Sequence, residues 1–551
     1  MKKGKLPVRS PSLTSRLYTF FAAHAFSIAL VGIFIIGLVL RLWPAYTRQF
    51  WEDELATYAF ATSPYSWIEQ LIRPADDRPP LFYLIIRLFT KFTQNEFLLR
   101  LPGILLSWFS VFITYKAIRR YSKKAAWFVT FILLFSLVRI EYSWQLRDYS
   151  ILMVPTSLML YFFTRFIEKL LGKGVMSKKD VYGLTISAFI GCMINYIFII
   201  FTISLFSWIF IFVCRHWYTK KERVNWRFLA WSLGLQLPLV GTLLYYLSSQ
   251  TQTIQETCGW IPKVSTYSYF LINAVFLGFS NNMYDLYSSD TALLRDNVIL
   301  TVIILVFFIF CIYLLEKKKI AINSVIKVLF YSGIYVYVIG YIGTILCSHM
   351  LGVNMFLIRT FLRIGNMFLI SFGIGVYIAC KGIVKKKYIS MSMLFASFMY
   401  FCVFIIMYFD WFTPSLFDFK TGIPERPGMK MVNDVWEPGD HVIYLPLYFE
   451  VLYPLYYWKD TPEKFSSLRL FMNIYVSDID NFFVQYKQKI SEDMKYTFYT
   501  PFNEKQGKIY LLNWNITGPE YEHIVRYCQE TRNTEFKTIY RQSNMYVAVC
   551  E

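Results

Sequence analysis

The chain has 551 residues, of which 56% are hydrophobic and 20% aromatic, and its mean hydropathy is +0.41. Soluble domains are rarely this apolar, and several windows of about twenty residues carry few or no charges, which is enough to cross a hydrocarbon core of roughly 30 Å. The net charge of +20 comes from Lys and Arg in short loops between apolar runs, so it argues against nucleic acid as a partner. The composition predicts a polytopic α-helical membrane protein.

Span length and loop charge predict about eleven transmembrane helices. The first, residues 25–43, follows the basic start MKKGKLPVRS and lacks a small-residue cleavage site, so we interpret it as an uncleaved span. The later spans are expected at 98–118, 125–140, 148–165, two within 181–214, 228–247, 296–315, 328–347, one ending at KGIVKKK, and 389–410. Alternate loops are rich in Lys and Arg, which predicts an inner-membrane protein with a cytoplasmic N-terminus and an extracytoplasmic C-terminus.

The pattern changes after residue 411. Strand-length apolar runs, HVIYLPL, KIYLLNW and MYVAV, alternate with helix-like stretches such as GPEYEHIVRYCQETR. This predicts two parts, a transmembrane domain at 1–411 and a small extracytoplasmic α/β domain at 412–551. Cys528 and Cys550 share the second part, and whether they pair stays open.

The first outer segment, residues 44–97, is too long to be a simple connector. DELATYAFATS and SWIEQLIR have helical spacing, and PPLFYLIIRLFTKF reads as an amphipathic helix near the membrane interface. The segment opens with WEDE, which places Glu52, Asp53 and Glu54 next to the bilayer. Acidic residues also favour helix N-termini for structural reasons alone. Whether these three have a structural or a catalytic role therefore depends on the residues that accompany them.

Arginines are expected at the outer ends of two spans. Arg147 lies in SWQLRDYS, and Arg359 and Arg363 lie in FLIRTFLRIGNMF with the spacing of one helix face. Arginine near a membrane either reaches the headgroups or has a partner. Guanidinium groups also suit bidentate recognition of phosphate. Carboxylates near outer arginines would suit a reaction at an acidic lipid headgroup.

Four motifs in chain order resemble the GT-C glycosyltransferases, in the branch that holds protein O-mannosyltransferases and lipid A aminoarabinose transferases. Asp53 and Glu54 match the family's acidic pair, Arg78 the basic residue before Pro-Pro-Leu, Arg147 and Tyr149 its Arg-x-Tyr element, and Arg359 its Arg-aromatic-Leu element. Two positions depart from the pattern: Arg78 stands where relatives carry Lys or His, and Thr360 stands where an aromatic residue is common. The resemblance covers roughly residues 1–410.

The resemblance implies an inverting enzyme that moves a sugar from a polyprenyl-phosphate donor to an envelope glycan, lipid or protein. Asp53 would be the general base, with Glu54 in support, and cations would stabilise the leaving phosphate. The residues expected to bind the substrate are Arg78, Arg147, Tyr149, Arg359 and Arg363. No cofactor is expected, and no metal, because the five His lie far apart in the sequence.

Two other functions remain as alternatives. A transporter or flippase of polyprenyl-linked glycans would share the many spans and basic cavity residues, but the sequence lacks the inverted repeats expected of a secondary transporter. A scaffold that binds wall polymer through its tail would leave Asp53 and Arg78 without a role. The identity of the sugar and of the acceptor stays open.

Overall fold

The computed structural model describes most of the helical part of the chain and the strands of the C-terminal part. The described residues are 13–48, 50, 52–62, 66–72, 79–173, 178–220, 240–241, 245, 276, 291–351, 358–412, 432, 435–438, 440–445, 468–471, 495–496, 508–513, 525–526, 529, 535, 537–542 and 545–550. The predicted span at 228–247 and the helix-like stretch at 518–532 therefore lie largely outside the described residues.

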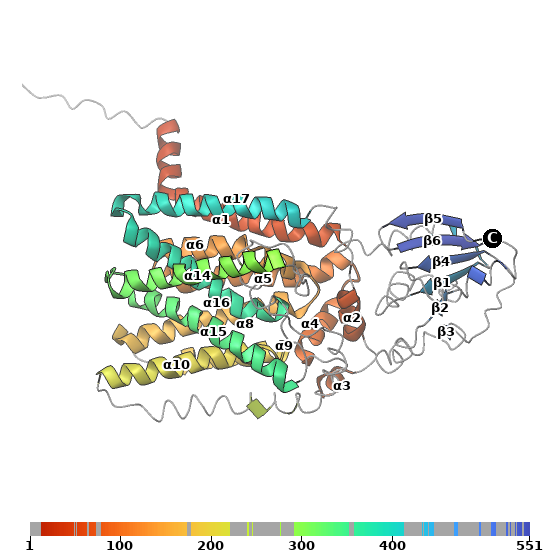
Figure 1. Ribbon diagram of the computed structural model, residues 1–551, viewed down its shortest axis with the longest axis horizontal. Coiled ribbons are helices and arrows are strands. Elements are labelled where there is room, and N and C mark those ends of the chain that lie inside the picture. The colour runs from red at the N-terminus through yellow and green to blue at the C-terminus, as the bar shows by residue number, and fades with distance from the viewer. Residues whose placement is uncertain are drawn as a thin grey trace, which may run out of the picture.

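Long helices form a bundle, and a small sheet lies beyond one end of it (Figure 1). The helices are α1 (Leu13–Thr47), α2 (Glu52–Ala61), α3 (Trp67–Ile72), α4 (Pro80–Thr90), α5 (Glu96–Arg119), α6 (Lys123–Leu134), α7 (Leu137–Trp144), α8 (Asp148–Glu168), α9 (Lys178–Ile194), α10 (Phe198–Lys220), α14 (Thr291–Glu316), α15 (Ser324–Leu351), α16 (Ile358–Ile383) and α17 (Ile389–Phe412). Short π and 3₁₀ turns at Lys169–Lys173 and Lys386–Tyr388 extend α8 and precede α17.

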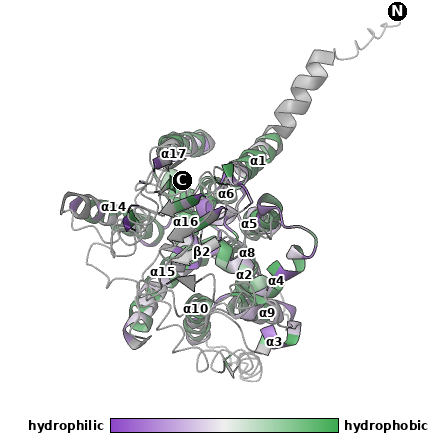
Figure 2. Ribbon diagram, turned by 90° about the vertical axis from the view of Figure 1, so that its right-hand side faces the viewer, coloured by the Kyte–Doolittle hydropathy of each residue, from purple (hydrophilic) through white to green (hydrophobic). Residues whose placement is uncertain are grey.

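Eight helices in the described part of the chain are long and apolar enough to cross a membrane, or nine if the bent pair α6 and α7 counts as one span. This confirms a polytopic helical membrane protein. The count differs from about eleven for two reasons. Helix α9 has only 17 residues, and the span predicted at 228–247 lies outside the described residues. Seen end-on, the helices of the bundle carry many hydrophobic stretches, with hydrophilic ones among them (Figure 2).

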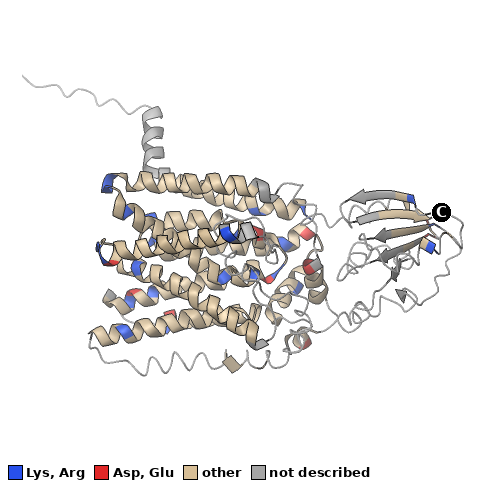
Figure 3. Cartoon of the chain, in the orientation of Figure 1, with Lys and Arg blue, Asp and Glu red and all other residues tan. Residues whose placement is uncertain are grey.

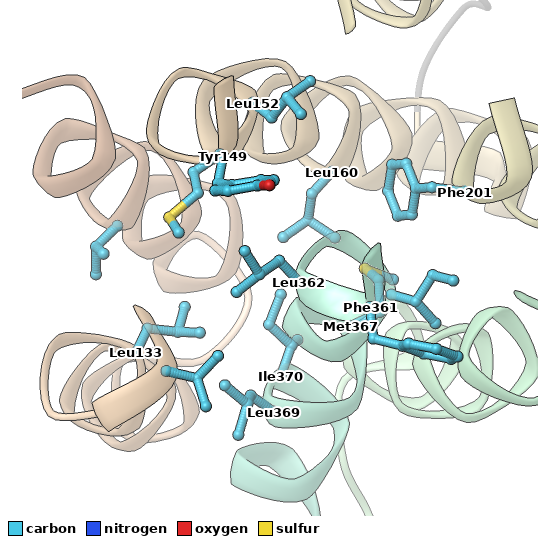
Figure 4. Packing of buried hydrophobic residues seen from close by; sticks show 14 of the residues in the cluster. Leu133, Tyr149, Leu152, Leu160, Phe201, Phe361, Leu362, Met367, Leu369 and Ile370 are labelled. Atoms are coloured by element: carbon cyan, nitrogen blue, oxygen red, sulfur yellow. The ribbon is translucent and has the colours of Figure 1, made fainter. Parts of the chain in front are cut away.

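Helices α8 and α16 form the centre of the bundle. Their most apolar windows are 72% and 83% buried, whereas those of α1 and α17 are 17% and 22% buried and face outward. Leu160 of α8 points towards Leu362 of α16 (Figure 4), and both belong to the buried core cluster. Helix α15 approaches α16 closely at Gly333, where a Cβ would lie only 2.6 Å from the carbonyl oxygen of Met367. Small residues permit such close approach between membrane helices.

A sharp break separates α6 from α7, whose axes differ by 56°. The last carbonyls of a helix have no intrahelical partner. Here the buried guanidinium of Arg41 from α1 donates to the carbonyl oxygens of Leu134, at 3.0 Å, and Leu133, at 3.4 Å. A cation at a helix C-terminus is also favoured by the helix dipole. Arg41 therefore stabilises the end of α6, and the chain turns into α7 towards the sheet end of the bundle.

The predicted helices of the first outer segment are confirmed as α2, α3 and α4, which lie at the end of the bundle that faces the sheet (Figure 1). Helix α4 is amphipathic, with Phe82, Tyr83 and Ile86 buried. Gln70 links the three helices, because its amide donates to the carbonyl oxygen of Phe60 at 2.8 Å and its oxygen accepts from Arg87 at 3.1 Å. Helices α2, α3 and α4, called the cap below, thus pack together at this end of the bundle.

The C-terminal part forms a six-stranded sheet with the order β3-β2-β1-β4-β6-β5. The strands are β1 (His441–Leu445), β2 (Leu468–Phe471), β3 (Lys495–Tyr496), β4 (Ile509–Asn513), β5 (Lys537–Gln542) and β6 (Met545–Cys550). Strands β1 to β4 are parallel, and β5 and β6 are antiparallel to their neighbours. The sheet confirms the three predicted strands. Cys550 is buried in β6, and Cys528 lies outside the described residues.

The side of the membrane on which the cap and the sheet lie remains a prediction, and cysteine labelling tests it. In a variant without native cysteines, Glu437→Cys beside the sheet should react with an impermeant maleimide in intact cells. Lys123→Cys at the start of α6 should react only after permeabilisation. Both side chains are exposed in the structure, so access depends on the membrane alone. The opposite result at both positions would reverse the predicted orientation.

Candidate active site

Three charged side chains from distant parts of the chain meet at the sheet end of the bundle. Oδ2 of Asp53, in the first turn of α2, lies 3.2 Å from Nη2 of Arg147 and 3.1 Å from Nη1 of Arg359. The two arginines follow Asp53 by 94 and 306 residues. Acidic and basic positions lie together at this end of the helices, while Lys and Arg outnumber acids at the opposite end (Figure 3). The structure therefore brings together three of the residues that the motifs singled out.

Arg147 is almost completely enclosed by the residues that it holds. It is the N-cap of α8 and has extended backbone dihedrals, which direct the chain into the helix. Its Nη1 donates to the carbonyl oxygen of Asp53 at 2.7 Å and to the hydroxyl of Thr57 at 3.1 Å. Only 4% of its side chain is exposed. Arg147 thus contacts both the backbone carbonyl oxygen and the carboxylate of Asp53.

Arg359 and Asp53 form the accessible edge of this cluster. Their side chains are 24% and 23% exposed, respectively. Arg359 is the second residue of α16, so its positive charge adds to the partial positive charge of the helix N-terminus. An anion is therefore favoured beside Arg359, and a neutral group with a proton to donate can approach Asp53 from the same side.

Glu54, the neighbour of Asp53, is fully buried in an ion pair. Its Oε1 accepts from Nε of Arg100 at 2.8 Å and its Oε2 from Nη2 at 2.5 Å. The same Oε1 accepts from the backbone N–H of Leu146 at 2.6 Å. Both charged side chains are 0% exposed, so Glu54 has no open edge towards a ligand. Glu54 and Arg100, together called the clamp below, join α2, α5 and the loop before α8.

The surroundings of Arg100 explain how a full charge is accommodated there. Its Nη1 donates to the carbonyl oxygens of Ala45 and Arg48 at the end of α1. Its guanidinium carbon lies 5.0 Å from the ring centre of Phe50 and 5.1 Å from that of Trp144. Carbonyl acceptors, a bidentate carboxylate and two aromatic faces together replace the water that the charge has lost.

A second ion pair supports the same region. Nη1 of Arg48 lies 3.5 Å from Oε2 of Glu141 on α7, and its guanidinium carbon lies 4.8 Å from the Trp144 ring centre. Burial lowers the pKa of Arg48 to about 10, while Glu141 opposes that shift. Arg48 therefore stays cationic at neutral pH. The pair joins the end of α1 to α7.

Arg363 lies one helical turn after Arg359 in α16, and its buried side chain is part of a polar bridge. Its Nη2 donates to Oδ1 of Asn195 at 3.3 Å, and Nδ2 of Asn195 donates to Oδ2 of Asp148 at 2.6 Å. Both charged residues are buried. The bridge joins α16 to the first turn of α8, next to Arg147. Tyr149 is also buried and packs edge-on against Tyr142, with ring centres 5.2 Å apart.

Some expected site residues cannot be placed. Arg78 lies outside the described residues, and nothing is described of the side chain of Glu52. The structure adds three residues that the motifs did not single out, Arg100, Thr57 and Asn195. The sequence could have indicated Arg100, because an arginine inside an apolar span needs a partner. In the part of the chain that the structure describes, no group of three or more His, Cys, Asp or Glu is placed to hold a metal ion.

Residues 77–245 match the family model described as dolichyl-phosphate-mannose-protein mannosyltransferase. This confirms the predicted resemblance over that part of the chain, which is less than half of its length. It includes Arg147 and Tyr149 but neither Asp53 nor Arg359. No curated protein matches the chain significantly.

Two solved structures of ArnT from Cupriavidus metallidurans are similar to the chain at 12% identity, with 96% of this chain and 98% of the other covered in each case. The TM-score is 0.45 for the apo state and 0.48 for the state bound to undecaprenyl phosphate. Both TM-scores lie below 0.5, so the likeness establishes neither a shared fold nor a shared ligand.

The clamp should contribute to the free energy of unfolding. Glu54→Gln leaves the charge of Arg100 buried without its counter-ion, which typically costs about 3–5 kcal/mol. We expect a large loss of unfolding free energy in mixed micelles, and partial recovery in the double variant Glu54→Gln/Arg100→Gln. Glu69→Gln is the matched control, because Glu69 exchanges hydrogen bonds with Ser66 in an exposed first turn of α3. Equal stability of Glu54→Gln and the control would contradict the clamp.

Proposed function

We propose that the chain is an inverting glycosyltransferase that moves a sugar from a polyprenyl-phosphate donor to an envelope glycan, lipid or protein. The observation that carries the proposal is the partly exposed pair of Asp53 and Arg359, 3.1 Å apart at one end of a membrane bundle. The match of residues 77–245 to a family named for a lipid-phosphate sugar donor supports the donor class. Transfer at the outer face is part of the proposal.

Asp53 is the general base in this proposal. An acceptor hydroxyl is a weak nucleophile, and a carboxylate within hydrogen-bond reach can take its proton as the new bond forms. The oxygen of the acceptor forms a bond to the anomeric carbon, while the bond from that carbon to the phosphate oxygen breaks. The electron pair of that bond leaves with the phosphate. A single displacement of this kind inverts the configuration at the anomeric carbon.

Arg359 is the residue that we assign to the leaving phosphate. Charge develops on that group as the glycosidic bond breaks, and a fixed cation stabilises it most in a site of low water content. Arg359 offers an accessible guanidinium at a helix N-terminus, beside the base. The sequence motifs pointed to Arg147 for the same contact, but its side chain is nearly buried against Asp53 and Thr57. We therefore assign Arg147 to positioning Asp53.

Roles for the remaining predicted residues follow from their places. Glu54 supports Asp53 through the clamp with Arg100. Tyr149 and Arg363 are buried behind the accessible edge, so we assign them to the shape and charge of its inner wall. Arg78 keeps its expected role at the phosphate as a proposal, since it lies outside the described residues.

A donor screen tests the proposal directly. The purified protein, reconstituted in lipid, is incubated with a set of polyprenyl-phosphate sugars and an extract of envelope acceptors, and consumption of each donor is measured. One donor should be consumed with release of the polyprenyl phosphate, and the product should have the inverted anomeric configuration. Consumption of none of them, together with ATP-independent movement of an intact glycolipid across the bilayer, would favour a flippase instead.

The base assignment predicts that Asp53→Asn slows turnover by roughly 10²–10⁴-fold, because the amide keeps the shape and cannot accept the proton. The variant should lose some stability, because the buried Arg147 loses the charge of its partner, but it should still fold, since Arg147 keeps its hydrogen bonds to the carbonyl oxygen at position 53 and to Thr57. Initial rates, donor-analogue binding and thermal stability are measured on one preparation, with Glu69→Gln as the control. Turnover within about threefold of the parent would remove Asp53 from the role of base.

Substitutions of Arg147 and Arg359 should differ in their effect on binding of the donor. Arg359→Gln removes an accessible charge-assisted contact, so binding of a non-hydrolysable donor analogue should weaken by about ten- to a hundredfold. Arg147→Gln should mainly lower turnover, because Arg147 holds the base and lies away from the open edge. Isothermal titration and single-turnover rates measure the two effects. Weaker analogue binding in Arg147→Gln than in Arg359→Gln would reverse the assignment.

A further inference from the structure

A polar cavity lies between α5 and α8, at the end of the bundle opposite Asp53. Its volume is about 180 Å³. Its polar lining consists of Lys116, Arg120, Tyr121, Tyr161, Thr164 and Arg165. A water molecule needs only about 10–15 Å³ of such volume, so the cavity has room for a group of several heavy atoms. Its walls come from the last turns of two membrane-spanning helices.

The lining carries three cations, Lys116, Arg120 and Arg165, two of which are paired with carboxylates that lie outside it. No acidic side chain lines the cavity among the residues that the structure describes. Glu168 and Asp180 stand behind it and hold two of its cations: Oε2 of Glu168 lies 3.0 Å from Nη2 of Arg120, and Oδ1 of Asp180 lies 2.9 Å from Nε of Arg165. The ammonium of Lys116 lies 4.7 Å from the ring centre of Phe112. The two ion pairs orient the partly exposed arginines, and Lys116 adds a charge that has no acidic partner in the described part of the chain.

Tyr121 contributes to the order of this wall. Its hydroxyl donates to Oε2 of Glu168 at 3.0 Å. Burial raises the pKa of Tyr121, and the nearby Glu168 raises it further. The hydroxyl therefore keeps its proton and holds the carboxylate of Glu168 against Arg120. Guanidinium binds phosphate oxygens in a fork, so Arg120 and Arg165 supply groups that suit a phosphate.

An apolar stripe on α5 leads from the middle of the helix to the cavity. Leu105 and Phe109 are 43% and 46% exposed. They lie on one helix face with Phe112 and Lys116, because the spacings of four, three and four residues return to the same side. An acyl chain can follow this stripe while its headgroup enters the cavity. Free phosphate would make no use of it.

We propose that the cavity between α5 and α8 binds the phosphate of an anionic membrane phospholipid. The lipid would belong to the leaflet on the side opposite the candidate active site, which the Lys and Arg content of this end makes the cytoplasmic side. This inference does not depend on the reaction proposed for Asp53. The ligand is a phosphodiester or phosphomonoester headgroup with an acyl chain that covers Leu105 and Phe109.

Lipid binding to the intact protein tests the proposal. The protein is purified in a neutral detergent, supplied with phosphatidylglycerol or phosphatidylcholine, and bound lipid is counted by native mass spectrometry across a concentration series. The parent should retain phosphatidylglycerol in preference to phosphatidylcholine. Lys116→Gln/Arg120→Gln should weaken phosphatidylglycerol binding by about tenfold or more, since two charge-assisted contacts are lost. A parallel series with inorganic phosphate measures binding of the free ion.

The matched control is Arg119→Gln/Lys123→Gln, which removes the same two charges at the same end of the bundle but outside the cavity lining. It should bind phosphatidylglycerol like the parent. Lys116→Gln alone should show part of the loss, and it disturbs no ion pair in the described part of the chain, so folding is preserved. Equal weakening in the control, no preference for phosphatidylglycerol in the parent, or binding of inorganic phosphate without the lipid would each overturn the proposal.

Discussion

One buried carboxylate, that of Glu54, holds together the elements of the candidate active site. Glu54 accepts hydrogen bonds from the side chain of Arg100 and from the backbone of Leu146. Its neighbour in the chain is Asp53, and the neighbour of Leu146 is Arg147. A single side chain therefore joins the two chain segments that carry Asp53, the proposed base, and Arg147. The cost of burying this charge is offset by the bidentate pair and by the carbonyl groups and rings around Arg100.

Exposure increases in steps from this clamp towards the open edge. Glu54 and Arg100 are fully buried, Arg147 is nearly so, and Asp53 and Arg359 are about one-quarter exposed. Water is thus kept from the groups that maintain the shape and reaches only the groups assigned to chemistry. Such a layered arrangement keeps side chains near one productive geometry, which catalysis by positioned charges requires.

Most of the helical architecture could be predicted from the sequence, because span length and charge are strong signals. The break between α6 and α7 could not, since residues 125–140 contain neither Gly nor Pro and the break depends on Arg41 from another helix. The motifs identified Asp53, Arg147 and Arg359, which the structure brings together. They favoured Asp53 over Glu54 as the base but identified no partner for Glu54, because successive helical residues point about 100° apart and only the packing shows that Glu54 faces Arg100.

The long sequence separation within the site has a consequence for biosynthesis. Asp53 and Arg147 enter the membrane with the first helices, but Arg359 follows Asp53 by 306 residues and arrives only with α16. A nascent chain therefore carries its carboxylate for most of translation without the cation assigned to the leaving phosphate. The cluster of Asp53, Arg147 and Arg359 is therefore complete only once α16 has joined the bundle.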